Sequence, residues 1–181
     1  FESVYTSEKR LLMQEARDEV LAIYRSAGLD KQDTWKEGED HIALELEFEQ
    51  IMATRTVEAL RKGDEDEAVA LLTTQKNFLE DHLAAWAPMM TSDMKRFAQT
   101  DLYRGLAYLT DGFLQTDQTF LDDVLAETNR AGPKEGAMDN KQDKTYAGMT
   151  RRTLCLGAGG AAVMLGLGGL KYVGSQPIVR P

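Results

Sequence analysis

Two Glu-Asp-His triplets carry the residue types best suited to chemistry: Glu39–Asp40–His41 and Glu80–Asp81–His82. On a helix, His41 and Glu45 would share one face, and His82 from a neighbouring helix could add a third ligand to a metal site. The Glu-x-x-His pairs of helical di-iron proteins are absent, and no Ser, Thr or Cys adjoins either histidine. We therefore predict no catalytic residue, no metal site and no cofactor, and interpret the histidines as hydrogen-bonding groups between helices.

The second chemically distinctive segment is MTRRTLCL at residues 149–156, which joins two guanidinium groups to an apolar sequence. It matches the twin-arginine export pattern, Ser/Thr-Arg-Arg-x-hydrophobic-hydrophobic, and the apolar run at 154–170 contains six glycines. A charged n-region followed by an apolar h-region is the layout of a secretion signal. We predict a twin-arginine signal peptide over 149–171 and a signal C-region over 172–181, with these motif residues: Thr150, Arg151, Arg152, Leu154, Cys155 and Leu156.

The glycines determine how such a signal must be held. Each glycine lowers helix propensity by roughly 1 kcal/mol relative to alanine, so the run forms a helix only where a host surface stabilises it. The paired guanidinium groups bind carboxylates in a bidentate manner. The sequence therefore predicts a C-terminal signal helix that docks in an apolar groove flanked by acidic side chains.

The charge distribution indicates that an acidic surface able to bind such a signal lies within the same chain. Residues 1–127 hold 27 Asp and Glu against 13 Lys and Arg, whereas residues 128–181 hold 8 Lys and Arg against 3 Asp and Glu. The net charge of the whole chain is −9, which argues against nucleic acid as a partner. The single cysteine, Cys155, excludes an intrachain disulfide and favours a reducing compartment, so we expect a cytoplasmic location.

The hydrophobic periodicity of residues 1–127 is typical of helices, and no segment alternates as a strand does. Gly28 and Gly63 predict two helix ends, and Pro88 predicts a third. We expect an extended entry segment over 1–13, a loop over 29–38, and helices over 14–27, 39–62, 64–86, 92–98 and from 100 to about 125. The predicted fold class is all-α. A flexible linker over 128–148, rich in Gly, Lys, Asp and Asn, follows the helices.

Two segments within these helices resemble the signature of the TorD/DmsD family of redox-enzyme maturation chaperones. GEDHIALELEFEQIM at 38–52 is similar to the family's Glu-x-Asp-His-Ile and Glu-Leu-x-Phe-Met pattern, with Glu49 in place of the methionine. KNFLEDHLAAWAPMM at 76–90 is similar to its Phe-x-x-x-His-Leu-x-x-Trp-x-Pro pattern. We interpret the matching residues of the second segment as structural: Phe78, His82, Trp86 and Pro88.

The resemblance implies an all-helical bundle that is a chaperone and not an enzyme. Such chaperones bind the twin-arginine signal peptide of a molybdenum or iron–sulfur redox enzyme precursor and delay its export until the cofactor is inserted. Their signal site is associated with the Asp-His-Ile region. This implies a signal-peptide-binding site at Asp40 and His41, to which we add the nearby Glu39, Glu45 and Trp35.

The family's domain has further helices before the position that matches Phe1, so we expect its N-terminal half to be a separate piece. The chain is predicted to be a fusion of the C-terminal portion of a TorD-like domain (1–127), the linker, and a redox enzyme's signal from Met138 onward. The signal would bind in cis or to a neighbouring copy, and the redox enzyme precursor would be the natural partner.

Two other functions fit parts of the sequence. A tail-anchored helical membrane protein would use the apolar run as its anchor, but a span needs about 20 apolar residues. The run has 17 residues including the six glycines, so we predict no stable membrane span. A metal-binding helical enzyme would instead use the two histidines.

Overall fold

The computed structural model describes residues 1–131 and 170–172, and the predicted all-α fold is confirmed. Helices dominate it, and two three-residue strands pair with each other. The elements in chain order are α1 (Glu2–Thr6), α2 (Glu15–Ser26), β1 (Leu29–Lys31), α3 (Ile42–Lys62), α4 (Glu65–Phe78), the π-helical turn η1 (Leu79–Leu83), α5 (Ala84–Phe97), α6 (Asp101–Ala131) and β2 (Leu170–Tyr172).

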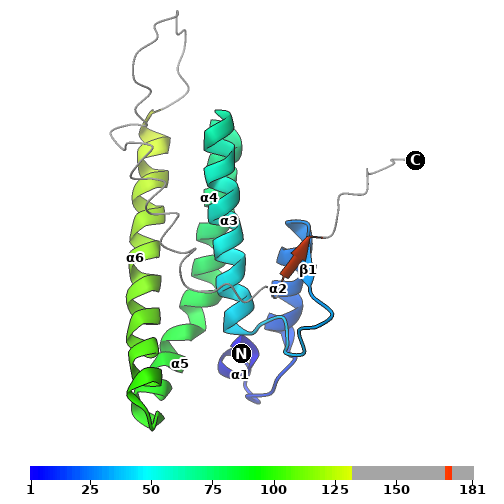
Figure 1. Ribbon diagram of the computed structural model, residues 1–181, viewed down its shortest axis with the longest axis vertical. Coiled ribbons are helices and arrows are strands. Elements are labelled where there is room, and N and C mark those ends of the chain that lie inside the picture. Colours follow the sequence, from blue (N-terminus) through cyan, green and yellow to red (C-terminus); the bar gives the residue numbers. More distant parts are fainter. Residues whose placement is uncertain (132–169, 173–181) are drawn as a thin grey trace, which may run out of the picture.

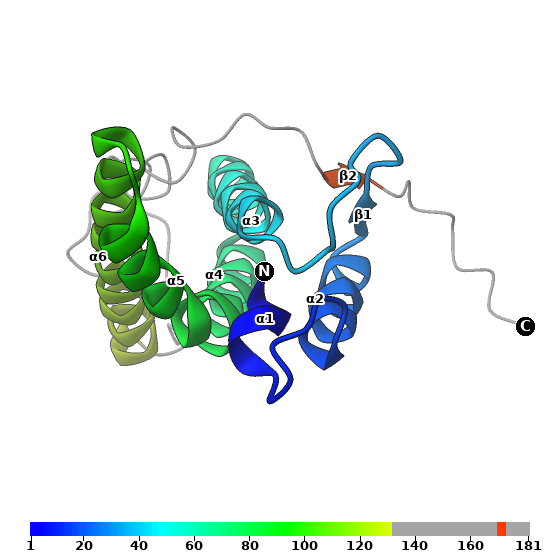
Figure 2. The same cartoon turned by 90° about the horizontal axis from the view of Figure 1, so that it is seen from below.

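The α3–α4 hairpin occupies the middle of the molecule, with α5 and α6 on one side of it and α2 with the two strands on the other (Figures 1 and 2). α1 lies at the end where α3 begins, in contact with α2 and α5. The loop that leads into α3 therefore lies beside α1, α2 and β1. This end of the bundle holds the predicted signal-binding residues.

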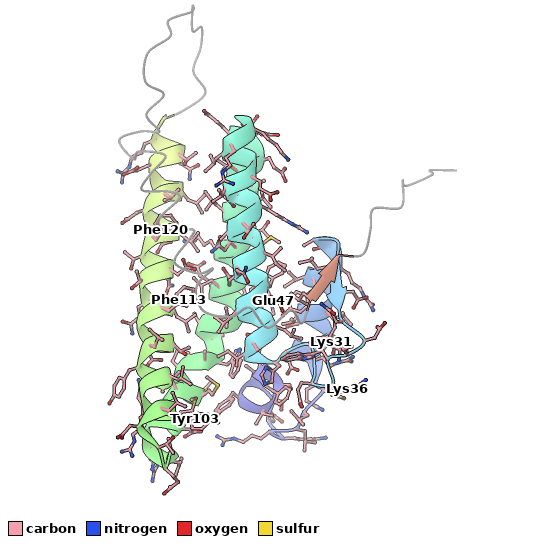
Figure 3. The ribbon with its side chains drawn as sticks, viewed as in Figure 1. Lys31, Lys36, Glu47, Tyr103, Phe113 and Phe120 are labelled. Atoms are coloured by element: carbon pink, nitrogen blue, oxygen red, sulfur yellow. The ribbon has the colours of Figure 1, made fainter. Side chains whose placement is uncertain are left out.

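A continuous hydrophobic core joins α2, α3, α4, η1, α6 and both strands. At its centre Phe48 of α3 packs against Phe78 of α4 with ring centroids 4.5 Å apart, and Tyr24 of α2 lies 5.2 Å from Phe48. Phe113 and Phe120 of α6, labelled in Figure 3, are partly buried against the same core. Burial of these rings supplies the main driving force for assembling the helices.

The predicted helix ends at the two glycines are confirmed. Gly28 and Gly63 have φ of 71° and 80°, a left-handed conformation that a side chain disfavours and glycine adopts freely. The acidic start after Gly63 is also confirmed, since the Asp64 carboxylate caps α4 by accepting the Glu67 N–H at 3.1 Å.

Several predicted boundaries are wrong. Residues 2–6 form α1 instead of an extended segment, and Pro88 lies inside α5 instead of ending a helix. Pro88 lies in the first turns of α5, and α5 follows directly on η1, whose wider π turn loosens the backbone so that one missing N–H is tolerated. As a result, the short helix predicted over 92–98 is the second half of α5.

The boundaries of the predicted linker and signal also shift. α6 continues to Ala131, so the first four residues of the predicted linker are helical. β1 lies in the predicted loop, and Leu170 and Lys171, predicted to end the signal helix, are extended in β2. The remaining predicted linker and signal residues, including all six motif residues at 150–156, lie outside the described part of the chain.

Candidate functional site

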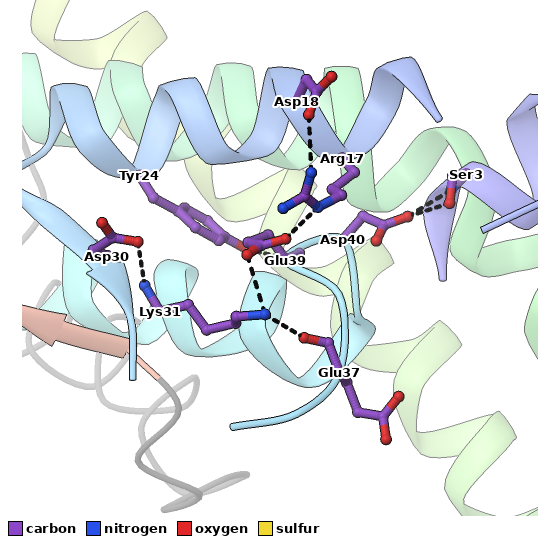
Figure 4. A network of polar contacts seen from close by, with 9 residues as sticks. All are labelled: Ser3, Arg17, Asp18, Tyr24, Asp30, Lys31, Glu37, Glu39 and Asp40. Carbon is purple, nitrogen blue, oxygen red and sulfur yellow. Dashed lines mark hydrogen bonds and ion pairs between the residues drawn. The ribbon is translucent and has the colours of Figure 1, made fainter. Parts of the chain in front are cut away.

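The carboxylate of Glu39 is the centre of a polar network that ties α2 and β1 to the loop before α3 (Figure 4). It pairs with Arg17 Nε of α2 at 2.5 Å and with Lys31 Nζ of β1 at 3.1 Å. The Tyr24 hydroxyl donates to the Glu39 carbonyl oxygen at 3.3 Å, and Lys31 Nζ donates to the Glu37 carbonyl at 2.7 Å. Burial opposes ionisation of Glu39, but the bonds from the two cations prevail and lower the pKa of its carboxyl group. Glu39 is therefore an ionised anchor for the loop.

Asp40 fastens α1 to the same loop. It is fully buried, and its Oδ2 accepts hydrogen bonds from the Ser3 N–H at 2.9 Å and the Ser3 hydroxyl at 2.5 Å. The Glu2 N–H donates to the Asp40 carbonyl at 3.0 Å. A Cβ at Gly38 would lie 2.8 Å from Asp40 Oδ1, so only glycine fits this close approach. The backbone at 38–40 is thereby held in a single path.

His41 caps α3 and forms the half-buried border of the site with Trp35. Its Nδ1 accepts the Ala43 N–H at 3.1 Å, which requires an imidazole without a proton on that nitrogen. Burial lowers the pKa of His41, so its neutral form prevails at physiological pH. The Trp35 ring meets the His41 ring edge-on at 5.7 Å, and within the described residues the buried Trp35 Nε1–H has no acceptor.

Glu45 lies behind this border and faces the protein interior. It is fully buried, and its Oε2 accepts the Trp86 Nε1–H at 2.9 Å. Burial, reinforced by the nearby charge of Glu2, raises the pKa of Glu45 well above its ordinary value. The neutral carboxyl group is the form that this position favours, which makes Glu45 a link between α3 and α5.

The side chains of the second triplet, Glu80–Asp81–His82, point to different surroundings and do not form one site. His82 is buried, and its Nδ1 lies 3.0 Å from Glu2 Oε2 of α1. Glu80 pairs with Lys76 at 3.1 Å, and the Asp81 side chain is exposed. Among the other residues of this motif, Phe78 and Trp86 are buried in the core and Pro88 is exposed on α5. Over residues 1–131 and 170–172, no three His, Cys, Asp or Glu side chains are grouped to hold a metal ion.

The two strands bring the end of the predicted signal back to the body. β2 pairs antiparallel with β1, with Lys31 opposite Leu170, Asp30 opposite Lys171 and Leu29 opposite Tyr172. The Leu170 N–H donates to Glu47 Oε2 of α3 at 3.1 Å, and Leu170 is 7% exposed. Figure 3 shows Glu47 and Lys31 on the side of the bundle where the strands lie.

A family model described as "Nitrate reductase delta subunit" matches residues 1–92, just over half of the chain. The chain belongs to this family. Relatives described as TorD chaperones confirm the predicted likeness to the TorD/DmsD family. No solved structure gives a significant match.

Three of the relatives show the extent of this likeness. A chaperone protein TorD of Vibrio cholerae is 28% identical over 71% of this chain and 57% of its own length. Another, from Photobacterium profundum, is 28% identical over 67% of this chain and 55% of its own length. A perchlorate reductase assembly chaperone protein of Dechloromonas aromatica is 27% identical over 61% of this chain and 47% of its own length. The chain thus spans about half the length of these relatives.

The structure places four of the five predicted signal-binding residues together. Trp35, Glu39, Asp40 and His41 lie in one short loop at the start of α3, whereas Glu45 faces the interior one turn later. Whether they bind a signal peptide stays a prediction, as does the expected separate N-terminal half. The contacts of Ser3 and Arg17, whose partners are distant in sequence, were not predicted, and neither was the nearer pairing of Lys31 with Glu39. The bond between Glu47 and Leu170, 123 residues apart, was also not predicted.

The two alternative functions also depend on where their residues lie. No helix within residues 1–131 is long and apolar enough to cross a bilayer, while the apolar run proposed as a tail anchor precedes the described β2. For the metal-binding alternative, His41 and His82 each have an identified hydrogen-bond partner, Ala43 and Glu2 respectively. Both histidines are therefore engaged in contacts that hold the bundle together.

Proposed function

We propose that this chain is a cytoplasmic redox-enzyme maturation chaperone that binds the twin-arginine signal peptide of a molybdenum or iron–sulfur enzyme precursor. By holding the signal it delays export until the cofactor is in place. The observation that carries this proposal is the match of residues 1–92 to the family, with TorD relatives extending over 129 residues. The twin-arginine motif at 150–156 supplies a ligand of the required type in the same chain.

The loop at 35–41 is the part of the body that we propose for reading the signal. Trp35 and the neutral His41 give it a half-buried aromatic surface on which an apolar side chain of the signal can pack. Asp40 holds this loop against α1. The loop is therefore already shaped before a peptide arrives, which lowers the entropic cost of binding.

The arginine pair needs carboxylates that the chain does not already use. Both oxygens of Glu39 are engaged by Arg17 and Lys31, so an incoming guanidinium would have to displace one of them. Glu37 lies beside this network with an exposed side chain (Figure 4). We propose that Glu37 makes the first contact with the arginines and that Glu39 acts mainly by positioning the loop.

The signal at the C-terminal end is proposed to bind in cis or to a neighbouring copy. An acidic body of net charge −14 over residues 1–127 attracts a tail of net charge +5 over residues 128–181. Attachment to the same chain raises the effective concentration of the signal toward the millimolar range, which favours occupancy by the chain's own tail.

The test compares two synthetic variant peptides of residues 149–181 with the natural peptide by fluorescence anisotropy on the full chain. A peptide with Arg151→Lys and Arg152→Lys keeps its charge but loses bidentate pairing, so it should bind about tenfold more weakly at low salt. A peptide with Arg180→Lys makes the same exchange outside the motif and should bind as the natural peptide does. Equal binding of all three peptides would show that the arginine pair is not recognised.

A further inference from the structure

We propose that β1, Glu47 and the core position filled by Leu170 form a strand-addition site for the last residue of the hydrophobic run of a twin-arginine leader and the residues that follow it. Leu170–Tyr172 of this chain is the occupant in cis. The site adjoins the loop at 35–41 through Lys31 but binds a different part of the leader, and the assignment of its ligand to a leader rests on the proposed function. The ligand class is an extended peptide with an apolar residue followed by a basic one.

The first support is the pairing itself. β1 is three residues long, and β2 is the strand beside it in the described part of the chain. The pairing joins residues that are about 140 positions apart, so β1 is a strand edge that a distant segment completes. Main-chain pairing of this kind accepts many sequences, because every peptide offers the same N–H and C=O groups.

The second support is that one side chain of the added strand enters the core. Leu170 is 7% exposed and belongs to the same cluster as Leu29 of β1 and Phe48 of α3. A single buried apolar side chain gives register to a short strand, because shifting the strand by one residue would turn this side chain away from the core. The site therefore selects an apolar residue at the first strand position.

The third support is a side chain of α3 that accepts a hydrogen bond from the backbone of the added strand. Glu47 is 7% exposed and its Oε2 accepts the Leu170 N–H at 3.1 Å, a charge-assisted bond from α3 to the added strand. The register also sets Asp30 opposite Lys171. Asp30, whose carboxylate also pairs with Arg25 Nε at 3.5 Å, thus lies opposite the second position of the added strand, which suits a leader with a basic residue there.

The position of Leu170–Tyr172 in the sequence indicates which part of a leader the strand-addition site binds. Leu170 is the last residue of the apolar run that starts at Leu154, and it follows Arg152 by 18 residues. The arginine pair and the end of the run can therefore be held at two separate places on the body. A tethered occupant also competes with a leader that arrives from another protein.

Hydrogen exchange on the full chain tests the site in cis. We expect Leu170→Asp to release β2 and to accelerate amide exchange in the segment containing residues 29–31 by tenfold or more. Ile178→Asp introduces the same charge eight residues later and should leave this segment unchanged. Glu47→Gln keeps an oxygen acceptor and should remain close to the natural chain, whereas Glu47→Ala should accelerate exchange. Unchanged exchange in Leu170→Asp, or equal acceleration in Ile178→Asp, would overturn the proposal.

Peptide binding separates this inference from the proposed function. The full chain with Leu170→Asp has a vacant edge, so the natural peptide of residues 149–181 should bind it about tenfold more tightly than it binds the natural chain. The peptide that itself carries Leu170→Asp should lose this gain. If that peptide binds as well as the natural one while the twin-lysine peptide does not, the strand-addition site is wrong and the proposed function stands. If the twin-lysine peptide binds as well as the natural one and the Leu170→Asp peptide does not, the site stands and recognition of the arginine pair is wrong.

Discussion

Replacing Asp117 by asparagine should stabilise the protein, and the gain should depend on pH. Asp117 of α6 is 6% exposed, and its Oδ2 accepts only a long hydrogen bond of 3.4 Å from Gln75 Nε2 of α4. Glu49 of α3 is fully buried nearby, and burial together with the Asp117 charge raises the pKa of Glu49 well above its ordinary value. Two carboxyl groups thus share an apolar interface with no cation among their described contacts.

The size of the effect follows from the pKa of Asp117. Burial raises this pKa from 3.8 to about 6, so the folded state binds a proton more tightly than the unfolded chain does. Stability is therefore lost as the pH rises from 3.8 to about 6 and levels off above that range. The full cost at neutral pH is about 3 kcal/mol, and at pH 4 it is about 0.5 kcal/mol. An asparagine side chain at this position cannot ionise and avoids this cost.

Urea denaturation at pH 4.5, 6 and 7.5 measures the difference between Asp117→Asn and the natural chain. We expect the variant's advantage in unfolding free energy to grow from about 1 kcal/mol at pH 4.5 to about 2–3 kcal/mol at pH 7.5. Asp123→Asn, at an exposed position of the same helix, is the control and should change little at any pH. An advantage that is the same at pH 4.5 and pH 7.5 would refute the argument, because a packing effect would not follow the titration.

Two further predictions concern the loop before α3. Gly38→Ala should lower the unfolding free energy by about 1–3 kcal/mol, since its Cβ would lie 2.8 Å from Asp40 Oδ1. In the matched variant Gly105→Ala, at an exposed position of α6, the added Cβ meets nothing within 4 Å. Thermal denaturation should show that this variant gains about 0.5–1 kcal/mol of unfolding free energy. A loss of stability in Gly105→Ala would contradict the prediction. Glu39→Gln should cost about 1–3 kcal/mol at pH 7 through its weakened bonds to Arg17 and Lys31. Because the pKa of Glu39 is lowered in the folded chain, the stabilisation by its ionised carboxylate is present above pH 4.5 and is lost in stronger acid. The urea midpoints of Glu39→Gln and the natural chain should therefore converge at low pH. A difference in midpoint that stays constant with pH would contradict this prediction.

The features predicted correctly from the sequence are those that depend on neighbours in the chain. Gly28 and Gly63 end helices because the backbone at each position needs a positive φ, which a single residue type signals. Asp64 caps α4 through a residue three positions later. The motif at 38–41 is recognisable from local sequence, although residues 39–41 were predicted to be helical and α3 begins only at Ile42.

The features that were missed depend on partners far along the chain. α1 has five residues, too few to be stable alone, and is held through Ser3 to Asp40 and through Glu2 to His82. β1 and β2 have three residues each and exist only as a pair. The role of Glu39 could not be read locally either, because nothing near it in sequence shows that Arg17 reaches its carboxylate.

The β1–β2 ladder is short, which affects how easily a strand paired with β1 can dissociate. Three residue pairs, one inserted leucine side chain and the bond from the Leu170 N–H to Glu47 hold the described strand, so a pull on its free end can separate it pair by pair. The helices draw most of their cohesion from the rings of Phe48, Phe78 and Tyr24, which such a detachment leaves in place. Under the proposed function, the chaperone can therefore release a bound leader without unfolding its helical core.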